Sequence, residues 1–177
     1  MPSIESALVV LVPEAEALVK PFRDRYDPSA AVGVPAHITL LYPFKPPDEV
    51  DGAVLDKLCH GFARFAPFRF ALASIRRFPA EALYLAPEPD EPFRRLTLAI
   101  SDWYPETPPY GGKWPDIVPH LSVASLPDEQ QLDRVADEFA QASRGILPIP
   151  ATAADVALMD NRSGRWQVRA TLGLGDA

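Results

Sequence analysis

The sequence has little cysteine and little positive charge. Cys59 is the only cysteine among 177 residues, so an internal disulfide is excluded and a thiolate metal cluster would need other ligand types. Lysine and arginine number 17 against 24 acidic residues, and the net charge of −7 argues against a protein that coats long duplex nucleic acid. A partner the size of a nucleotide or an RNA end remains compatible with this charge.

Long apolar runs are also missing. The apolar segment 7–12 is far too short to cross a bilayer, and no basic stretch followed by a long apolar one opens the chain. We therefore expect a cytoplasmic protein with no membrane partner. Hydrophobic residues make up 47% of the chain and charged residues 23%, which is typical of a soluble globular protein, and this length fits one domain or two small lobes.

Hydrophobic periodicity predicts helices interleaved with hairpins. Strands are expected at 6–12, 36–42, 68–72, 82–86, 120–126, 155–159 and 165–172, with residues 166, 168, 170 and 172 on one face. Helices are expected at 14–26, 48–65 and 128–143, and Pro21 should kink or divide the first. Another helix is expected after the start signal Asp90-Glu91-Pro92, with its apolar residues at helical spacing up to Trp103. Segments 27–35 and 104–119 are expected to be loops, the second because it holds five prolines and a Gly-Gly pair.

The order of these elements in the second half of the chain roughly repeats their order in the first. No long series of parallel strand-helix-strand units is present, which favours antiparallel sheets. The sequence therefore predicts an α+β fold in which residues 1–177 form a single domain. Two pseudo-symmetric lobes, each an antiparallel sheet with flanking helices, are expected around a central cleft.

Two of the three histidines stand in nearly the same sequence context. The first motif is Pro-Ala-His37-Ile-Thr39-Leu and the second is Pro-His120-Leu-Ser122-Val. Because alternate residues of a strand share a face, His37 and Thr39 point to one side while the apolar residues between them point to the other. The same holds for His120 and Ser122. Each motif thus places an imidazole and a hydroxyl on the polar face of an otherwise apolar strand.

Two such units suit displacement at phosphorus. A water or hydroxyl attacks from one side while the leaving oxygen departs from the other, so a base and an acid are needed across from each other. With an ordinary pKa of about 6.5, one imidazole can be neutral and the other protonated near neutral pH. Each hydroxyl can donate a hydrogen bond to a non-bridging phosphate oxygen. This scheme requires no metal and no cofactor.

The duplicated motif resembles that of the 2H phosphoesterase superfamily, which includes 2'-5' RNA ligase-like proteins and cyclic nucleotide phosphodiesterases. The resemblance extends over essentially the whole chain, and the segment Leu41-Tyr42-Pro43-Phe44 after the first motif is also similar to the family. It implies a bilobal fold with one motif from each lobe lining a shared cleft. It further implies that His37 and His120 are the catalytic pair and that Thr39 and Ser122 bind the phosphate oxygens.

A structural rather than catalytic role for the histidines also remains open. A histidine on a strand is often structural, and both members of the pair can be so. His60 falls opposite the apolar stripe of the predicted helix 48–65, so it is expected to be solvated and inert. A metal site would need Asp116 and Asp160 to converge on the histidine pair, which we disfavour because at least three ligands must meet.

Aromatic residues near the motifs are candidate substrate contacts. Tyr42 and Phe44 end the first histidine strand and can either stack on a base or belong to the core. Tyr110, Lys113 and Trp114 lie in the long loop before His120, where a lid or a specificity element would be placed. Trp114 can equally serve only to anchor that loop.

The leading functional hypothesis is metal-independent hydrolysis of a 2',3'-cyclic phosphate at a nucleotide or RNA end, with RNA ligation as the reverse direction. The alternative is a module that binds a nucleotide or an RNA end without turning it over. The sequence leaves open which histidine is the acid and whether the substrate is a terminal RNA phosphate, a cyclic ADP-ribose-type product or a 2'-5' linkage. It also leaves the oligomeric state open.

Overall fold

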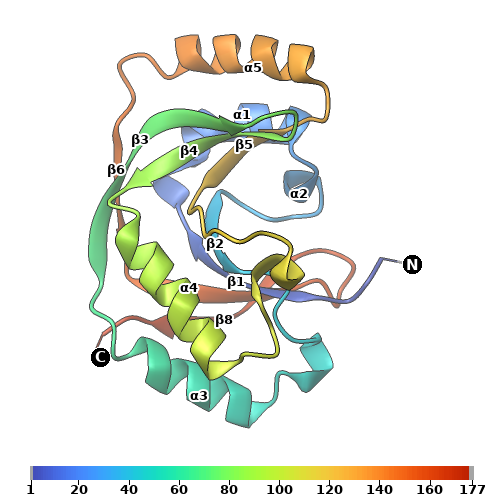
Figure 1. The fold of residues 1–177 in the computed structure, drawn as a ribbon, viewed down its shortest axis with the longest axis vertical. Coiled ribbons are helices and arrows are strands. Elements are labelled where there is room, and N and C mark those ends of the chain that lie inside the picture. Colours follow the sequence, from blue (N-terminus) through green and yellow to red (C-terminus); the bar gives the residue numbers. More distant parts are fainter. Residues whose placement is uncertain (1, 176–177) are drawn as a thin grey trace.

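The computed structural model describes residues 2–175, which form two four-stranded antiparallel sheets with flanking helices (Figure 1). The strand order is β2-β1-β7-β8 in the first sheet and β5-β4-β3-β6 in the second. The first sheet consists of β1 (Ser6–Leu11), β2 (His37–Leu41), β7 (Asp155–Asp160) and β8 (Gln167–Gly173). The second consists of β3 (Phe68–Phe78), β4 (Ala82–Glu88), β5 (Leu121–Ser125) and β6 (Ile149–Ala153). The predicted α+β class with two antiparallel sheets is confirmed.

Five helices flank the two sheets. They are α1 (Glu16–Tyr26), α2 (Pro28–Ala31), α3 (Gly52–Phe62), α4 (Glu91–Trp103) and α5 (Glu129–Ala142), with 3-10 turns at η1 (Pro13–Ala15), η2 (Pro47–Glu49) and η3 (Pro109–Gly112). α1 follows a strand of the first sheet but packs on β5 of the second, whereas α4 follows β4 but packs on β2. α3 contacts β8 and α5 contacts β4, at opposite ends of the molecule (Figure 1).

The first sheet combines the two ends of the chain. β1 pairs with β2, its neighbour in sequence, and also with β7 from the last part of the chain. β3 to β6 lie between these segments in sequence and form the second sheet. The rough repeat in element order therefore does not coincide with the division into sheets, because the hairpin β3-β4 belongs to the second sheet and the hairpin β7-β8 to the first.

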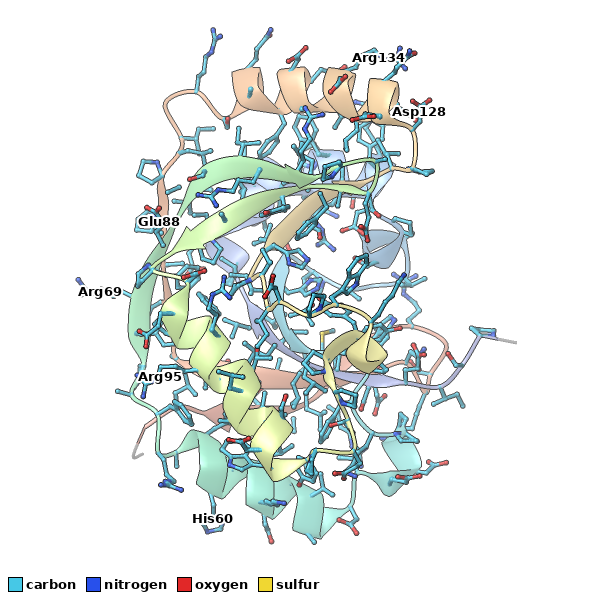
Figure 2. All side chains as sticks on the ribbon, in the orientation of Figure 1. His60, Arg69, Glu88, Arg95, Asp128 and Arg134 are labelled. Atoms are coloured by element: carbon cyan, nitrogen blue, oxygen red, sulfur yellow. The ribbon has the colours of Figure 1, made fainter. Side chains whose placement is uncertain are left out.

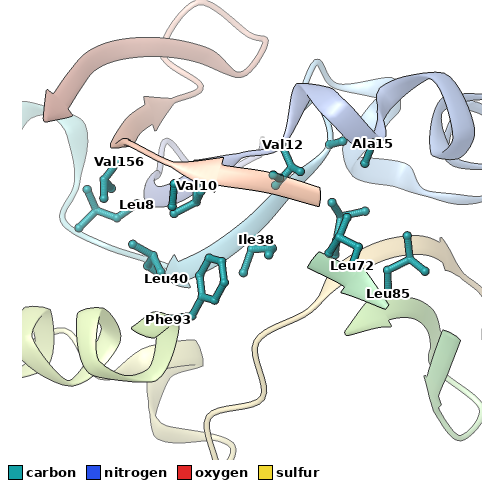
Figure 3. Packing of buried hydrophobic residues seen from close by; sticks show 14 of the residues in the cluster. Leu8, Val10, Val12, Ala15, Ile38, Leu40, Leu72, Leu85, Phe93 and Val156 are labelled. Carbon is teal, nitrogen blue, oxygen red and sulfur yellow. The ribbon is translucent and has the colours of Figure 1, made fainter. Parts of the chain in front are cut away.

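A large apolar core lies between the sheets and helices. Figure 3 shows Ile38 and Leu40 of β2 together with Leu8 and Val10 of β1 and the ring of Phe93 from α4. Phe93 is fully buried, and removing such a side chain from water stabilises a fold by about 1.5–3 kcal/mol. This packing fixes β2, and with it the first histidine motif, against α4.

The opposite face of β1 is apolar as well. Ala7 and Val9 form a smaller cluster with Val34, Ala157 and Met159, separate from the main core. The partly buried rings of Tyr42 and Trp166 pack against this cluster. β1 therefore carries an unbroken apolar sequence because both of its faces are covered, and the small cluster forms the floor of a pocket beside the first histidine motif.

Three predicted segments in the first half differ from the structure. α1 continues through Pro21 as one helix, because Leu18 and Val19 of that helix are packed in the core. The predicted loop 27–35 contains the short helix α2, whose N-cap Asp27 accepts a hydrogen bond from the backbone of Ser29. The predicted helix 48–65 is only Gly52–Phe62, since Asp51 caps it by accepting a hydrogen bond from the backbone N–H of Val54.

Three further differences concern strands. β3 extends to Phe78 instead of residue 72, because it pairs with β6 at one end and with β4 at the other. β6 was not predicted, since it contains Pro150, but proline is tolerated on an edge strand. In β8 the register shifts at Arg169, so Val168 is 46% exposed and does not share the buried face with Leu172.

The helices within the described residues 2–175 are all short. None of these helices is long and apolar enough to cross a bilayer, and the longest, α5, has 14 residues.

Candidate active site

The two strands that carry the histidine motifs lie against each other in the middle of the molecule (Figure 1). β2 ends the first sheet, where it pairs with β1, and β5 ends the second, where it pairs with β4. Figure 2 shows the side chains that crowd this region, whereas the labelled His60 lies at the far end of the molecule. The contact between these two edge strands brings together motifs that are far apart in sequence.

Alternation along each strand separates polar from apolar side chains. His37 and Thr39 in the first motif, and His120 and Ser122 in the second, are partly exposed. The intervening residues are buried at 0–2% exposure: Ile38, Leu40, Leu121 and Val123. This is the arrangement that the period of two predicts, although β5 as bounded begins one residue after His120.

The two imidazole rings are held in the same way. Nδ1 of His37 lies 2.8 Å from the carbonyl oxygen of Pro35, and Nδ1 of His120 lies 2.7 Å from that of Val118. A carbonyl oxygen only accepts hydrogen bonds, so Nδ1 carries the hydrogen in each ring. Nε2 of each neutral ring is then an acceptor, and it is the atom available to exchange a proton with a ligand.

Desolvation lowers the pKa of both imidazoles. Burial is the largest cause at His37, whose pKa falls from 6.5 to about 4 against the opposing hydrogen bond to Pro35. Of the nearby charges, Arg23 lowers this pKa and its ion-pair partner Asp27 raises it. Burial likewise lowers the pKa of His120, while its backbone hydrogen bond and the carboxylate of Glu81 act in the opposite direction. Both rings are therefore neutral at pH 7 in the free protein, and the neighbouring charges favour protonation of His120.

A pocket of about 250 Å³ opens beside His37. Its floor is the small apolar cluster on the outer face of β1 and β7, and its wall includes the rings of Tyr42 and Trp166, which meet edge to face at 6.2 Å. Thr39 and Ser29 contribute the hydroxyl groups of this pocket. A flat apolar group with a few polar atoms fits such a lining.

A buried ion pair is hydrogen-bonded to Ser29, one of the residues that line the His37 pocket. Nε of Arg23 lies 2.9 Å from Asp27, and the two side chains are only 3% and 6% exposed. The hydroxyl of Ser29 donates to Asp27 at 2.8 Å and accepts from Arg23 at 3.0 Å. The pair thus joins the end of α1 to α2 and fixes the orientation of one pocket hydroxyl.

A second pocket, of about 300 Å³, opens beside His120. Its walls include Tyr110 and Trp114 from the long loop between α4 and β5, and Glu81 from the β3-β4 turn. The imidazole of His120 meets the rings of Phe78 and Tyr84 at centroid distances of 5.2 and 5.5 Å. The ring of His120 is thus oriented both by its backbone hydrogen bond and by two aromatic neighbours on the second sheet.

The structure places three of the five predicted contact residues in the two pockets. Tyr42 lines the His37 pocket, and Tyr110 and Trp114 line the His120 pocket. The ammonium group of Lys113 lies 5.0 Å above the Trp114 ring, outside both linings. The interpretation of Phe44 as a stacking residue is wrong, because this residue is 5% exposed and belongs to the core.

Tyr42 contributes its ring to the pocket, since its hydroxyl is engaged elsewhere. That hydroxyl donates a hydrogen bond to Glu5 at 2.6 Å. Burial and this hydrogen bond raise the pKa of Tyr42 to about 12, so the phenol stays neutral. Phe44, two residues later, meets the ring of Tyr104 at 5.2 Å within the core.

Several pocket residues were not identified from the sequence as site residues. Phe78 and Glu81 come from the β3-β4 hairpin and line the His120 pocket, and Trp166 comes from the turn before β8 and lines the His37 pocket. Tyr84 of the same hairpin contacts the His120 ring. Tyr84 lies directly opposite Ser122 across the β4-β5 ladder. Only the pairing register reveals these neighbours, because the strands concerned are distant in sequence.

The remaining candidates lie apart from the histidine pair or are engaged elsewhere. His60 is exposed on α3, as predicted. Asp160 accepts a hydrogen bond from Arg162 at 3.0 Å, and Arg169 is 3.8 Å away. Asp116 lines the His120 pocket, but within residues 2–175 no three His, Cys, Asp or Glu side chains converge as a metal site.

Comparisons with known proteins point to one family. A family model described as the 2'-5' RNA ligase superfamily matches residues 11–165. The fold is similar to that of E. coli LigT complexed with NADP+ (TM-score 0.60, 14% identity) and with 3'-AMP (TM-score 0.60, 12% identity). In both cases the likeness covers 99% of this chain and 100% of the other.

TT0787 of Thermus thermophilus is also similar, with a TM-score of 0.58 and 19% identity over 98% of this chain and 100% of that one. No curated protein sequence gives a significant match. At these identities the structural likenesses show a shared fold.

Proposed function

Because the chain belongs to the 2'-5' RNA ligase superfamily, whose members are 2H phosphoesterases, we propose that it is a metal-independent phosphodiesterase. The resemblance drawn from the sequence motifs is thereby confirmed at the level of the family. The proposed substrate is a 2',3'-cyclic phosphate or a related phosphodiester at a nucleotide or RNA end. The observation that carries this proposal is the pair of identically held imidazoles on adjoining strands, each with Nε2 free.

In this proposal His37 is the general base and His120 the general acid. Burial lowers the pKa of His37 to about 4 and so disfavours a positive charge there, whereas Glu81 opposes the effect of burial at His120 and favours one. Nε2 of His37 takes a proton from the attacking water as its oxygen bonds to phosphorus. The ester bond on the opposite side breaks, and Nε2–H of His120 gives its proton to the leaving oxygen. The product is a phosphate monoester and a free hydroxyl.

Substrate binding supplies the proton that the acid needs. In the free protein the lowered pKa leaves His120 mostly neutral at pH 7. A bound phosphodiester brings a negative charge next to the ring, which raises the pKa of an adjacent imidazole. The protonated form of His120 is therefore stabilised when a substrate is in place.

Thr39 and Ser122 are the proposed donors to the non-bridging phosphate oxygens. Each lies two residues after its histidine, on the same face of its strand. A hydroxyl held there stabilises the charge that grows on these oxygens as the new bond forms. Removing one such donor typically lowers kcat by about 10²–10³.

The two pockets support a nucleotide-sized substrate. Each imidazole stands at an aromatic, largely apolar pocket, of about 250 and 300 Å³, which suits a base or a ribose beside the phosphate. The LigT structures with NADP+ and 3'-AMP show that a protein of this fold binds such molecules. RNA ligation would be the same ring opening with a ribose hydroxyl in place of water: the hydroxyl oxygen bonds to phosphorus, one ring ester bond breaks, and a phosphodiester joins the two ends. Cleavage of that linkage is its reverse.

The test is turnover of 2',3'-cyclic nucleotides in the presence of EDTA. His37→Ala and His120→Ala are each expected to lower kcat by about 10²–10⁴, since each removes one proton-transfer group. His60→Ala is the matched control, because His60 is an exposed histidine on α3. Cleavage at the wild-type rate by both site variants would refute the proposal. Tight binding of a nucleotide that stays chemically intact would favour the alternative of a binding module.

A further inference from the structure

A third pocket, of about 510 Å³, adjoins the His120 pocket. It is bounded by Arg76 of β3, the second half of β4, the start of α4 and the end of the loop that precedes β5. Val118 lines both pockets, and Tyr84, which lines this one, meets the ring of His120 at 5.5 Å. This hollow, the Arg76 pocket, thus extends the candidate active site across the second sheet.

The strand register places Arg76 in line with the second histidine motif. Arg76 lies opposite Tyr84 in the β3-β4 ladder, and Tyr84 lies opposite Ser122 in the β4-β5 ladder. Residues that pair directly across neighbouring strands point to the same face of a sheet, so these three form a row. Neighbouring strands are about 4.8 Å apart, which puts the backbone of Arg76 about 10 Å from that of Ser122. Arg76 therefore lies beside the position of the reacting phosphate and not at it.

Arg76 supplies this pocket with a positive charge. Its side chain is exposed and, within residues 2–175, takes part in none of the ion pairs. The other cation of the pocket, Arg94, is paired with Asp90 at 2.9 Å. The remaining carboxylate, Glu88, ends β4 four residues after Tyr84. The part of the pocket next to Tyr84 therefore carries a positive charge that can receive an anion.

The next residue of β3 has the opposite arrangement. Successive side chains of a strand point to opposite faces, and Arg77 forms an ion pair with Asp133 of α5. Arg76 and Arg77 thus carry the same group at adjacent positions, but only Arg76 lines the pocket. Arg77 is for this reason a matched control for Arg76.

We propose that the Arg76 pocket binds a second phosphate of the substrate, carried on the 5' oxygen of the ribose whose cyclic phosphate is opened. This inference deepens the proposed function and rests on it. In that reaction His120 protonates the leaving ribose oxygen, so the ribose lies on the His120 side of the phosphorus atom. The aromatic pocket with Tyr110 and Trp114 suits the base, and the adjoining Arg76 pocket is then left for the group on the 5' oxygen.

A phosphate at this position has two sources. In a mononucleotide it is a terminal 5'-phosphate, and in an RNA end it is the phosphodiester to the preceding nucleotide. Both present non-bridging oxygens, which a guanidinium binds through two parallel charge-assisted hydrogen bonds. Such a local cation also allows a chain with a net charge of −7 to hold a substrate with more than one phosphate.

The experiment compares adenosine 2',3'-cyclic phosphate with and without a 5'-phosphate. The wild type is expected to turn over the 5'-phosphorylated compound with a kcat/KM about tenfold higher, through a lower KM, because the added contact is the same before and during ring opening. Arg76→Gln is expected to bring the ratio of the two kcat/KM values close to one. Arg77→Gln is expected to keep the wild-type ratio.

Two results overturn the inference even when the histidine variants are inactive. One is a wild-type ratio close to one, and the other is a ratio that Arg76→Gln leaves at its wild-type value. The dinucleotide ApA with a terminal 2',3'-cyclic phosphate then identifies the source of the phosphate. A gain equal to that of the 5'-phosphate assigns the pocket to the phosphodiester of an RNA end, and no gain assigns it to a terminal phosphate.

Failure of the proposed function is a separate result. If the wild type opens none of these cyclic phosphates, the binding of adenosine 3',5'-bisphosphate is compared with that of 3'-AMP by calorimetry. Tighter binding of the bisphosphate that Arg76→Gln abolishes supports the second phosphate site. Equal affinities of the wild type for the two ligands overturn it.

Discussion

Replacing His37 with glutamine is expected to remove about 3 kcal/mol of pH dependence from the free energy of unfolding between pH 6.5 and 4. In the folded protein the desolvated imidazole of His37 has a pKa of about 4, whereas in the unfolded chain it returns to 6.5. Above pH 6.5 neither state holds the proton, and the stability is at its full value. As the pH falls, the unfolded chain binds the proton first, so stability is lost until the folded ring is also protonated.

The magnitude follows from the two pKa values. Each pH unit between them corresponds to about 1.4 kcal/mol, so the interval from 6.5 to about 4 corresponds to about 3 kcal/mol. Glutamine does not titrate, and its amide can still donate a hydrogen bond to the carbonyl of Pro35. The substitution therefore removes the titration while keeping a polar partner for that carbonyl.

The assay is urea unfolding followed by tryptophan fluorescence, repeated at several values between pH 4 and 7. Carboxylates that titrate in the same range are common to the wild type and the variant, so they cancel in the difference. His60→Gln is the matched control, because it removes a histidine that is exposed on α3. The reasoning is refuted if His37→Gln loses stability on acidification as steeply as the wild type and His60→Gln.

Two further predictions concern the acid and the packing of α3. If His120 is the acid, kcat/KM should peak below pH 6.5, falling below about pH 4 as His37 is protonated and falling at higher pH as His120 loses its proton. Glu81→Gln should move only the alkaline limb of that profile to lower pH, and a shift of the acidic limb alone would contradict the assignment. Gly61→Ala should lower stability by about 1–3 kcal/mol despite alanine's better helix propensity, because its Cβ would overlap the ring of Trp103. A Tm equal to or above that of the wild type would show that Trp103 moves aside freely.

Local patterns predicted most of the elements, because each pattern reports on one face of one segment. Phe93, Leu96 and Ile100 repeat at helical spacing and are fully buried on α4. Boundaries were less predictable, since caps and packing set them: Asp51 starts α3 late, and core contacts carry α1 through Pro21. β6 was missed because Pro150 argues against a strand unless the strand lies at an edge.

The sequence identified the polar residues of the candidate site but not most of the aromatic residues that line its pockets. A repeated motif, in which a hydroxyl follows a histidine at the second position, identifies the polar residues His37, Thr39, His120 and Ser122. Trp166, by contrast, lies in the turn between β7 and β8, and it reaches the His37 pocket only because β1 pairs with both β2 and β7. Phe44 was included among the candidate contacts although it belongs to the core. The sequence does not distinguish it from the pocket residue Tyr42, because both are aromatic residues near the end of the same strand.

The sequence alone determined the histidine-hydroxyl units, their side of each strand and the family to which they belong. Those properties depend on residue order and on the geometry of an isolated strand, which are local. The tertiary structure decided that β2 and β5 lie together, that burial lowers the pKa of both imidazoles, and that Tyr110 from the loop between α4 and β5 lines the pocket beside His120. Contact between distant segments, desolvation and the field of neighbouring charges exist only once the chain is packed, so no local pattern carries them.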